Sequence, residues 1–207
     1  MYTIGKIRLN KQNCDALGKI YTGFPRISSY NPSDATYQYL LRDYYVKTAY
    51  NCCCGGQFKN DYVNVCALKT CIQQGARVLD FEIYSINDQP VVSTSTVSSY
   101  YIKETYNYVP FSDVINTIKS RAFTAAEAPN YEDPIIIHLR IKSNNQKMLS
   151  NLAEIFSGIN TYLLGTNYSF EYNTCEDNQC YARNLGDVTL KELNTDEYGK
   201  KRNRIIL

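Results

Sequence analysis

The sequence has no tryptophan, a single histidine and no excess of either charge, since 22 Lys and Arg residues face 20 Asp and Glu residues. This balance argues against a dedicated nucleic-acid-binding protein, which usually carries a basic patch or stripe. No apolar run approaches the about 18 residues that a membrane-spanning helix needs, and the first residues lack the apolar run of a secretory signal. We therefore expect no transmembrane segment, no signal peptide and a reducing, cytoplasmic compartment.

The sequence also lacks the cysteine spacing of a metal site. None of its eight cysteines lies in a CxxC pair, whereas structural zinc sites use closely spaced ligand pairs. In a reducing compartment we expect free thiols that pack as small hydrophobic side chains. In an oxidising compartment, Cys175 and Cys180 are close enough in the sequence to form a disulfide.

The length of 207 residues suits one domain or a large part of one. Residues 1–40 are polar and rich in turn signals, so we expect an irregular N-terminal extension that packs on a main domain of residues 41–207. In that domain, strand and helix signals alternate, which predicts an α/β fold with parallel strands joined by helices, as an open sheet or a barrel. The expected strands cover residues 44–48, 78–84, 90–94, 134–141 and 204–207. The expected helices cover residues 61–74, 112–123, 144–164 and 190–193.

Two of these strands place ionisable residues on one face. In VLDFEIY, Asp80 and Glu82 share a face and the apolar side chains share the other, and in IIIHLRI the same holds for His138 and Arg140. Buried charges are costly unless they are paired. One interpretation is therefore an internal salt-bridge cluster in which Arg140 neutralises the two acids. The other is a polar pocket at the C-terminal ends of barrel strands, where barrel enzymes place their sites.

Six segments carry a resemblance to a known family, and they occur in its order and at plausible spacing. They are LRDYYVKTAYN (41–51), GARVLDFE (75–82), PVVSTS (90–95), FSDVINTIKSRAF (111–123), PIIIHLR (134–140) and GKKRNRIIL (199–207). Together they resemble the X region of phosphoinositide-specific phospholipases C, from residue 41 to the end. The chain is also similar to the divergent form found in proteins of large DNA viruses, which implies host cytoplasm or a virion as its location.

The resemblance implies a TIM-type (β/α) barrel and the chemistry of a phosphoric diester hydrolase. Family members cleave a phosphodiester, typically phosphatidylinositol, with two histidines that move protons. In eukaryotic members calcium supports the attack, and in bacterial members an arginine replaces the metal. A full barrel needs about 250 residues and about eight strands. Because we count about five strands, we expect an incomplete barrel, truncated at its C-terminal side.

The two histidines of the family are missing at the matching positions. The first falls on Tyr50 and the second on Thr94. His138 is the only imidazole in the chain, and neither a tyrosine nor a threonine moves protons near neutral pH as an imidazole does. A general acid or base contributes factors of roughly 100 to 10,000, so the loss of both predicts a catalytically impaired protein, a pseudoenzyme.

The calcium ligands of the family are kept only in part. Asn51 matches the first ligand, and Asp80 and Glu82 match the next two with the acid types exchanged. The last ligand falls on Arg140, which reverses the charge. Calcium is thus the cofactor that the resemblance implies, and Arg140 argues against it.

Three functions follow from these observations. The first is a catalytically impaired X-like domain that binds or scaffolds, with a phosphoinositide or another phosphodiester headgroup as its ligand. The second is an active phosphodiesterase with a rearranged site, in which His138 is the acid–base and Asp80 and Glu82 bind a metal. The third is a non-catalytic interaction or virion-associated protein, whose 20 tyrosines cover the surface for a partner protein.

Overall fold

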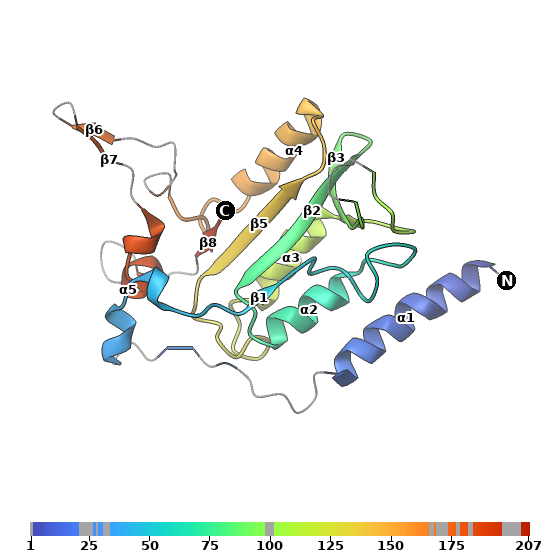
Figure 1. The fold of residues 1–207 in the computed structure, drawn as a ribbon, viewed down its shortest axis with the longest axis horizontal. Coiled ribbons are helices and arrows are strands. Elements are labelled where there is room, and N and C mark those ends of the chain that lie inside the picture. Colours follow the sequence, from blue (N-terminus) through green and yellow to red (C-terminus); the bar gives the residue numbers. More distant parts are fainter. Residues whose placement is uncertain are drawn as a thin grey trace.

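The computed structural model of the chain describes residues 2–20, 27, 29–30, 34–97, 102–165, 168, 174–176, 179–181, 184–195 and 204–207. Its largest unit is a mixed sheet with helices packed along one face (Figure 1). The strands of this sheet are β1 (Thr48–Ala49), β2 (Val78–Ile86), β3 (Gln89–Ser93), β4 (Val109–Pro110), β5 (Ile135–Ile141) and β8 (Ile205–Ile206).

The sheet is open. Its order is β4-β3-β2-β5-β8, and β1 pairs with the beginning of β2. β5 runs parallel to both β2 and β8, as the alternation of strands and helices predicts. The described residues contain six strands in this sheet, where about five were expected, and β4 and β8 form edges that do not meet. The closed barrel is therefore not confirmed, and the fold is a mixed α/β sheet.

β3 and β4 are antiparallel to their neighbours, contrary to the expectation of parallel strands. β2 and β3 form a hairpin whose two turn residues, Asn87 and Asp88, have φ values of 50° and 61°. Two consecutive residues with positive φ are typical of the type I′ turn, whose twist matches that of the strands. Asn and Asp tolerate this conformation better than other non-glycine residues. The hairpin therefore follows from the two turn residues.

Asparagine caps determine where two of the helices begin. The helices are α1 (Tyr2–Ile20), α2 (Val65–Gln73), α3 (Phe111–Arg121), α4 (Gln146–Ser157) and α5 (Leu190–Asn194). The Asn64 side chain accepts the backbone N–H of Cys66, so α2 begins after Asn64 and not at Asp61. Asn145 caps α4 in the same way, whereas α3 follows Pro110 without a side-chain cap. Gly75, with a φ of 81°, lies just after α2, which ends close to the expected residue 74.

The core lies between the sheet and helices α2, α3 and α4 (Figure 1). The apolar residues of β2, Leu79, Phe81 and Ile83, are fully buried there. The Phe81 and Phe111 rings meet edge to face at 6.4 Å. Burying each of these side chains contributes roughly 1.5–3 kcal/mol. This packing fixes which face of β2 points at the helices, so the opposite face carries the acidic residues.

The N-terminal segment departs from the expected irregular extension, because residues 2–20 form helix α1. A disulfide between Cys14 and Cys66 joins α1 to α2, and Asn13 donates a hydrogen bond to Asp61. The expectation of free thiols is thus wrong for Cys14 and Cys66. It holds for Cys52, Cys53, Cys54 and Cys71.

The small hairpin of β6 (Thr174–Glu176) and β7 (Gln179–Tyr181) sets the backbones of Cys175 and Cys180 opposite each other. Their side chains lie outside the described residues. No helix among the described residues is long and apolar enough to span a membrane.

Candidate functional site

The register between β2 and β5 brings the ionisable residues together. Asp80 lies opposite His138, and Glu82 lies opposite Arg140. Since side chains alternate along a strand, all four project from the face that the helices leave uncovered. Asp80 and Glu82 are almost fully buried, with 4% and 2% of their surfaces exposed. The sequence therefore predicted correctly that two adjacent strands direct these groups to a common place.

Arg140 is the centre of the cluster and makes four hydrogen bonds. Its Nε and one Nη2 hydrogen donate to the two oxygens of Asp80, at 3.0 and 2.8 Å. Nη1 donates to Oε1 of Glu82 at 2.5 Å, and Nη2 also donates to Oδ1 of Asn51 at 2.7 Å. A planar guanidinium suits such a fork of oxygens. The internal ion-pair cluster is therefore present, and Asn51, Asp80 and Glu82 are all held by one side chain.

Asp80 accepts hydrogen bonds from three residues. Besides Arg140, the backbone N–H of Asn51 donates to Oδ1 at 3.0 Å, and Nδ1 of His138 lies 2.7 Å from Oδ2. Burial alone would raise the pKa of Asp80, but the hydrogen bonds from Arg140, Asn51 and His138 outweigh it and lower the pKa below its usual value. Asp80 is therefore a carboxylate at neutral pH.

Glu82 has a second partner that the sequence analysis missed. The buried hydroxyl of Tyr84 donates to Oε2 of Glu82 at 2.6 Å, so each carboxylate oxygen of Glu82 has a donor. Burial and the neighbouring Glu82 raise the pKa of Tyr84 above its usual value. Tyr84 lies on the same face of β2 as Asp80 and Glu82, because side chains two residues apart share a face of a strand. This alternation alone could have placed Tyr84 beside Glu82.

The two positions of the family histidines behave differently. Tyr50 lies at the cluster, with its ring 4.3 Å from the Arg140 guanidinium carbon and 60% of its surface exposed. Contact between a guanidinium and an aromatic face is favourable. Thr94 is buried, and its hydroxyl donates to the carbonyl of Phe58 at 2.9 Å. Tyr50 therefore contacts the ion-pair cluster, whereas the Thr94 hydroxyl is directed to the backbone.

His138 is the most exposed member of the cluster. Its side chain is 62% exposed, while the Asp80 carboxylate that contacts it is 6% exposed. The contact uses Nδ1, so Nε2 is the ring nitrogen left for solvent or a ligand. A carboxylate bonded to one ring nitrogen fixes the orientation of the ring, as in acid–base dyads. The site therefore has one oriented imidazole.

The residues at the calcium-ligand positions do not fit a calcium ion. Calcium binds six to eight oxygens, including carboxylates, and here the matching oxygens of Asn51, Asp80 and Glu82 already accept hydrogen bonds from Arg140. The positive charge of Arg140 lies where the charge of the cation would act. Among the described residues, no group of three or more His, Cys, Asp and Glu side chains is arranged to hold a metal.

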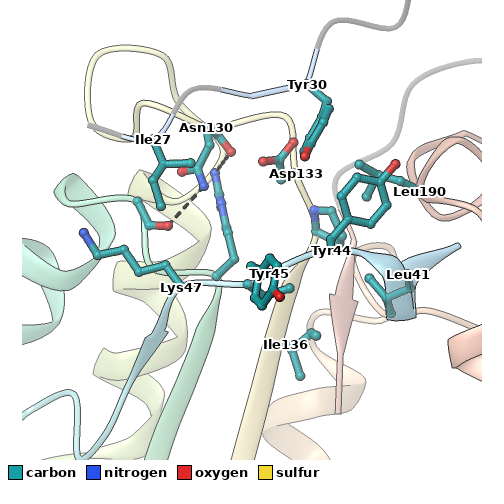
Figure 2. A pocket seen from close by; sticks show the side chains of 14 residues that line it. Ile27, Tyr30, Leu41, Tyr44, Tyr45, Lys47, Asn130, Asp133, Ile136 and Leu190 are labelled. Carbon is teal, nitrogen blue, oxygen red and sulfur yellow. Dashed lines mark hydrogen bonds between the residues drawn. The ribbon is translucent and has the colours of Figure 1, made fainter. Parts of the chain in front are cut away.

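A separate cavity of about 70 Å³ lies where β2 and β5 begin (Figure 2). It is lined by Tyr30, Tyr44, Tyr45 and Ile136, among others, and the rings of Tyr30 and Tyr44 meet edge to face at 4.8 Å. Small-molecule sites usually measure roughly 300–1,000 Å³. The cavity contains none of the residues of the ion-pair cluster, so we place the candidate site at the cluster.

A comparison with known protein families identifies the family of this chain. The family model for the phosphatidylinositol-specific phospholipase C X domain matches residues 37–172, more than half of the chain. The chain belongs to this family. No curated protein sequence matches the chain.

Two solved structures are similar to this X domain. PLC21 of S. officinalis is 18% identical with a TM-score of 0.48, and the match covers 60% of this chain and 14% of that one. PLC21 of L. pealei is 17% identical with a TM-score of 0.48, and the match covers 66% of this chain and 17% of that one. The X domain thus spans less than a fifth of either enzyme.

Proposed function

We propose that this X domain is a catalytically impaired member of its family and does not cleave phosphatidylinositol by the two-histidine, calcium-supported route. The observation that carries the proposal is the set of hydrogen bonds from Arg140 to Asp80, Glu82 and Asn51. The oxygens that would hold the cation are already neutralised and satisfied by a side chain. Calcium would have to displace a guanidinium that four hydrogen bonds hold in place.

The proton carriers support the same conclusion. The family mechanism needs one group to accept a proton from the attacking hydroxyl and another to protonate the leaving group. Tyr50 carries a phenol in place of an imidazole, and the Thr94 hydroxyl donates a hydrogen bond to the backbone carbonyl of Phe58. His138 can serve one of the two steps, which leaves the other without an imidazole.

The role that remains is a binding or scaffolding domain. The family assignment suggests a phosphoinositide or another phosphodiester headgroup as the ligand class, and the solvent-facing His138 side chain lies beside the partly exposed Arg140 guanidinium. Exposed tyrosines, among them Tyr45, Tyr50 and Tyr106, favour a partner surface as well.

A cleavage assay tests the proposal. Purified protein is incubated with phosphatidylinositol vesicles and with glycerophosphodiesters, in calcium and in chelator, and released headgroup is measured against an active family member. We expect no product above the buffer blank in any condition. Calcium-dependent product that Asp80→Asn abolishes would overturn the proposal.

A second candidate is an active phosphodiesterase with a rearranged site, which the 2.7 Å contact between Asp80 and His138 favours. A carboxylate that orients an imidazole is a recurring general acid–base device. In this case, turnover is independent of calcium and is lost in His138→Ala. Turnover that survives in His138→Ala would contradict this candidate.

A further inference from the structure

A second cavity, of about 320 Å³, lies between residues 47–54, helix α2 and helix α1. This volume is at the lower end of the roughly 300–1,000 Å³ that is typical of small-molecule sites. Asp80, Glu82, His138 and Arg140 do not line it. The cavity is therefore a different place from the ion-pair cluster, and the function proposed for the cluster does not account for it.

Helix α1 forms one wall of the cavity and is fastened to the rest of the protein. Leu17 of α1 belongs to the lining. The disulfide from Cys14 to Cys66 joins α1 to α2, and the Asn64 side chain donates a hydrogen bond to Asn10 of α1 at 3.0 Å. The cavity is thus bounded by segments that are distant in the sequence and held together covalently.

The charge of the lining favours an anion. Among the described residues that line the cavity, Lys47 is the one with a formal charge, and none is Asp or Glu. The Lys47 ammonium donates to the carbonyl of Gln74 at 2.7 Å, and because an ammonium has three donors, two remain for a ligand. The Lys47 side chain is also exposed to solvent, so an anion can reach it from outside.

Asn51 adds a neutral donor to the same lining. It is 3% exposed, and its Nδ2 amide makes no hydrogen bond within the part of the chain that the structure describes, while its Oδ1 accepts from Arg140 at 2.7 Å. A buried donor without an acceptor is costly. The cavity therefore suits a ligand that carries oxygen acceptors.

Small apolar side chains make up much of the remaining lining. Ala49, Ala67 and Ala76 contribute to it together with Leu17. Such a surface favours hydrocarbon over water. A single lysine balances one negative charge, whereas a phosphate monoester carries about −1.5 to −2 at pH 7. A short hydrocarbon chain with one carboxylate fits these properties better than a phosphate does.

We propose that this cavity binds a small monocarboxylate, with the carboxylate at Lys47 and the hydrocarbon part against the alanine side chains. The ligand binds reversibly, and no covalent step is involved. A ligand oxygen that accepts from Nδ2 of Asn51 also holds the orientation in which Oδ1 of the same amide meets Arg140. Binding does not require that the ion-pair cluster be catalytic.

Saturation-transfer NMR on the full chain, with its Cys14–Cys66 disulfide intact, tests the proposal. The probes are butyrate, butyramide and butylamine, which share a chain length and differ in charge. We expect saturable binding of butyrate, and binding at least roughly threefold weaker for the neutral and cationic probes, as for a partly exposed ion pair. The proposal is overturned if butyrate shows no saturable binding, or if butyramide binds as tightly as butyrate.

Variants locate the binding. Lys47→Met removes the charge and should weaken butyrate binding roughly threefold or more, whereas Lys47→Arg should retain it. Lys69→Met is the matched control, because Lys69 lies on α2 outside the cavity lining. Ala67→Leu fills the cavity and should abolish binding, and urea unfolding shows whether each variant is folded. Unchanged affinity in folded Lys47→Met, or an equal loss in Lys69→Met, would overturn the proposal even if Ala67→Leu does not fold.

Discussion

Replacing Arg140 by methionine would leave two buried carboxylates without their shared partner. The change removes four hydrogen bonds from a site where the Asp80 and Glu82 side chains are 6% and 2% exposed. Breaking a buried ion pair by removing one partner costs about 3–5 kcal/mol. Because the Arg140 side chain is 23% exposed, water can reach the site, and we expect the lower end, about 3 kcal/mol. Urea unfolding followed by circular dichroism at pH 7 measures this loss.

The stability that Arg140→Met loses relative to the wild type should become smaller as the pH falls. In the wild type the folded pKa of Asp80 is lowered, so its contribution is complete above the unfolded pKa of about 3.9 and is lost only as the pH falls through the folded pKa. In Arg140→Met, burial of Asp80 without its main hydrogen-bond donor raises the folded pKa of this carboxylate, so protonation stabilises the variant as the pH falls. The difference between the two proteins should therefore be smaller at pH 5 than at pH 7.

Arg42→Met is the matched control for this experiment. Arg42 pairs with Asp187 at the surface, where the two side chains are 59% and 52% exposed. Exposed ion pairs contribute about 0–1 kcal/mol, so Arg42→Met should lose little free energy of unfolding. The difference between this variant and the wild type should be the same at pH 5 as at pH 7. If Arg140→Met loses no more than Arg42→Met, the ion-pair cluster does not stabilise the protein as argued above.

Three further changes test other parts of the structure by urea unfolding. Tyr84→Phe removes the donor to a buried oxygen of Glu82 and should cost roughly 1.5–3 kcal/mol; an unchanged midpoint would contradict that contact. Asn64→Ala removes the cap of α2 and should cost about 1 kcal/mol, and a gain in stability would show that another residue caps the helix. Cys14→Ser removes the disulfide to Cys66, which spans a sequence separation of 52 residues, and loop entropy predicts a loss of at most about 4 kcal/mol in the free energy of unfolding. Reduction of the wild-type disulfide should cause the same loss.

The central part of the fold could be predicted from the sequence because the pattern there is strong. β2 and β5 alternate apolar and ionisable residues, and the structure has both strands in parallel register. The direction of β3 was missed because the turn at Asn87 and Asp88 lacks the glycine that usually marks a tight hairpin. Helix α1 was not predicted because the polar residues and turn signals of residues 1–40 favour irregular structure. The Cys14–Cys66 pairing joins distant residues, and connectivity of this kind cannot be deduced from spacing alone.

The sequence predicted which residues belong to the candidate site, but not which of them bond to one another. The alternation placed Asp80, Glu82, His138 and Arg140 on one face, and the structure brings them within hydrogen-bonding distance. Whether Arg140 would bond one acid or both depends on its rotamer, which the sequence does not contain. The outward position of the Tyr50 ring over Arg140 likewise depends on the turn at Asn51, whose φ is 48°.

Calorimetric titration of calcium into the purified protein tests most directly whether Arg140 has taken the place of the cation. If the oxygens of Asn51, Asp80 and Glu82 are satisfied by Arg140, millimolar calcium should give no saturable heat, and Asp80→Asn should behave like the wild type. Saturable calcium binding by the wild type that Asp80→Asn abolishes would contradict this account.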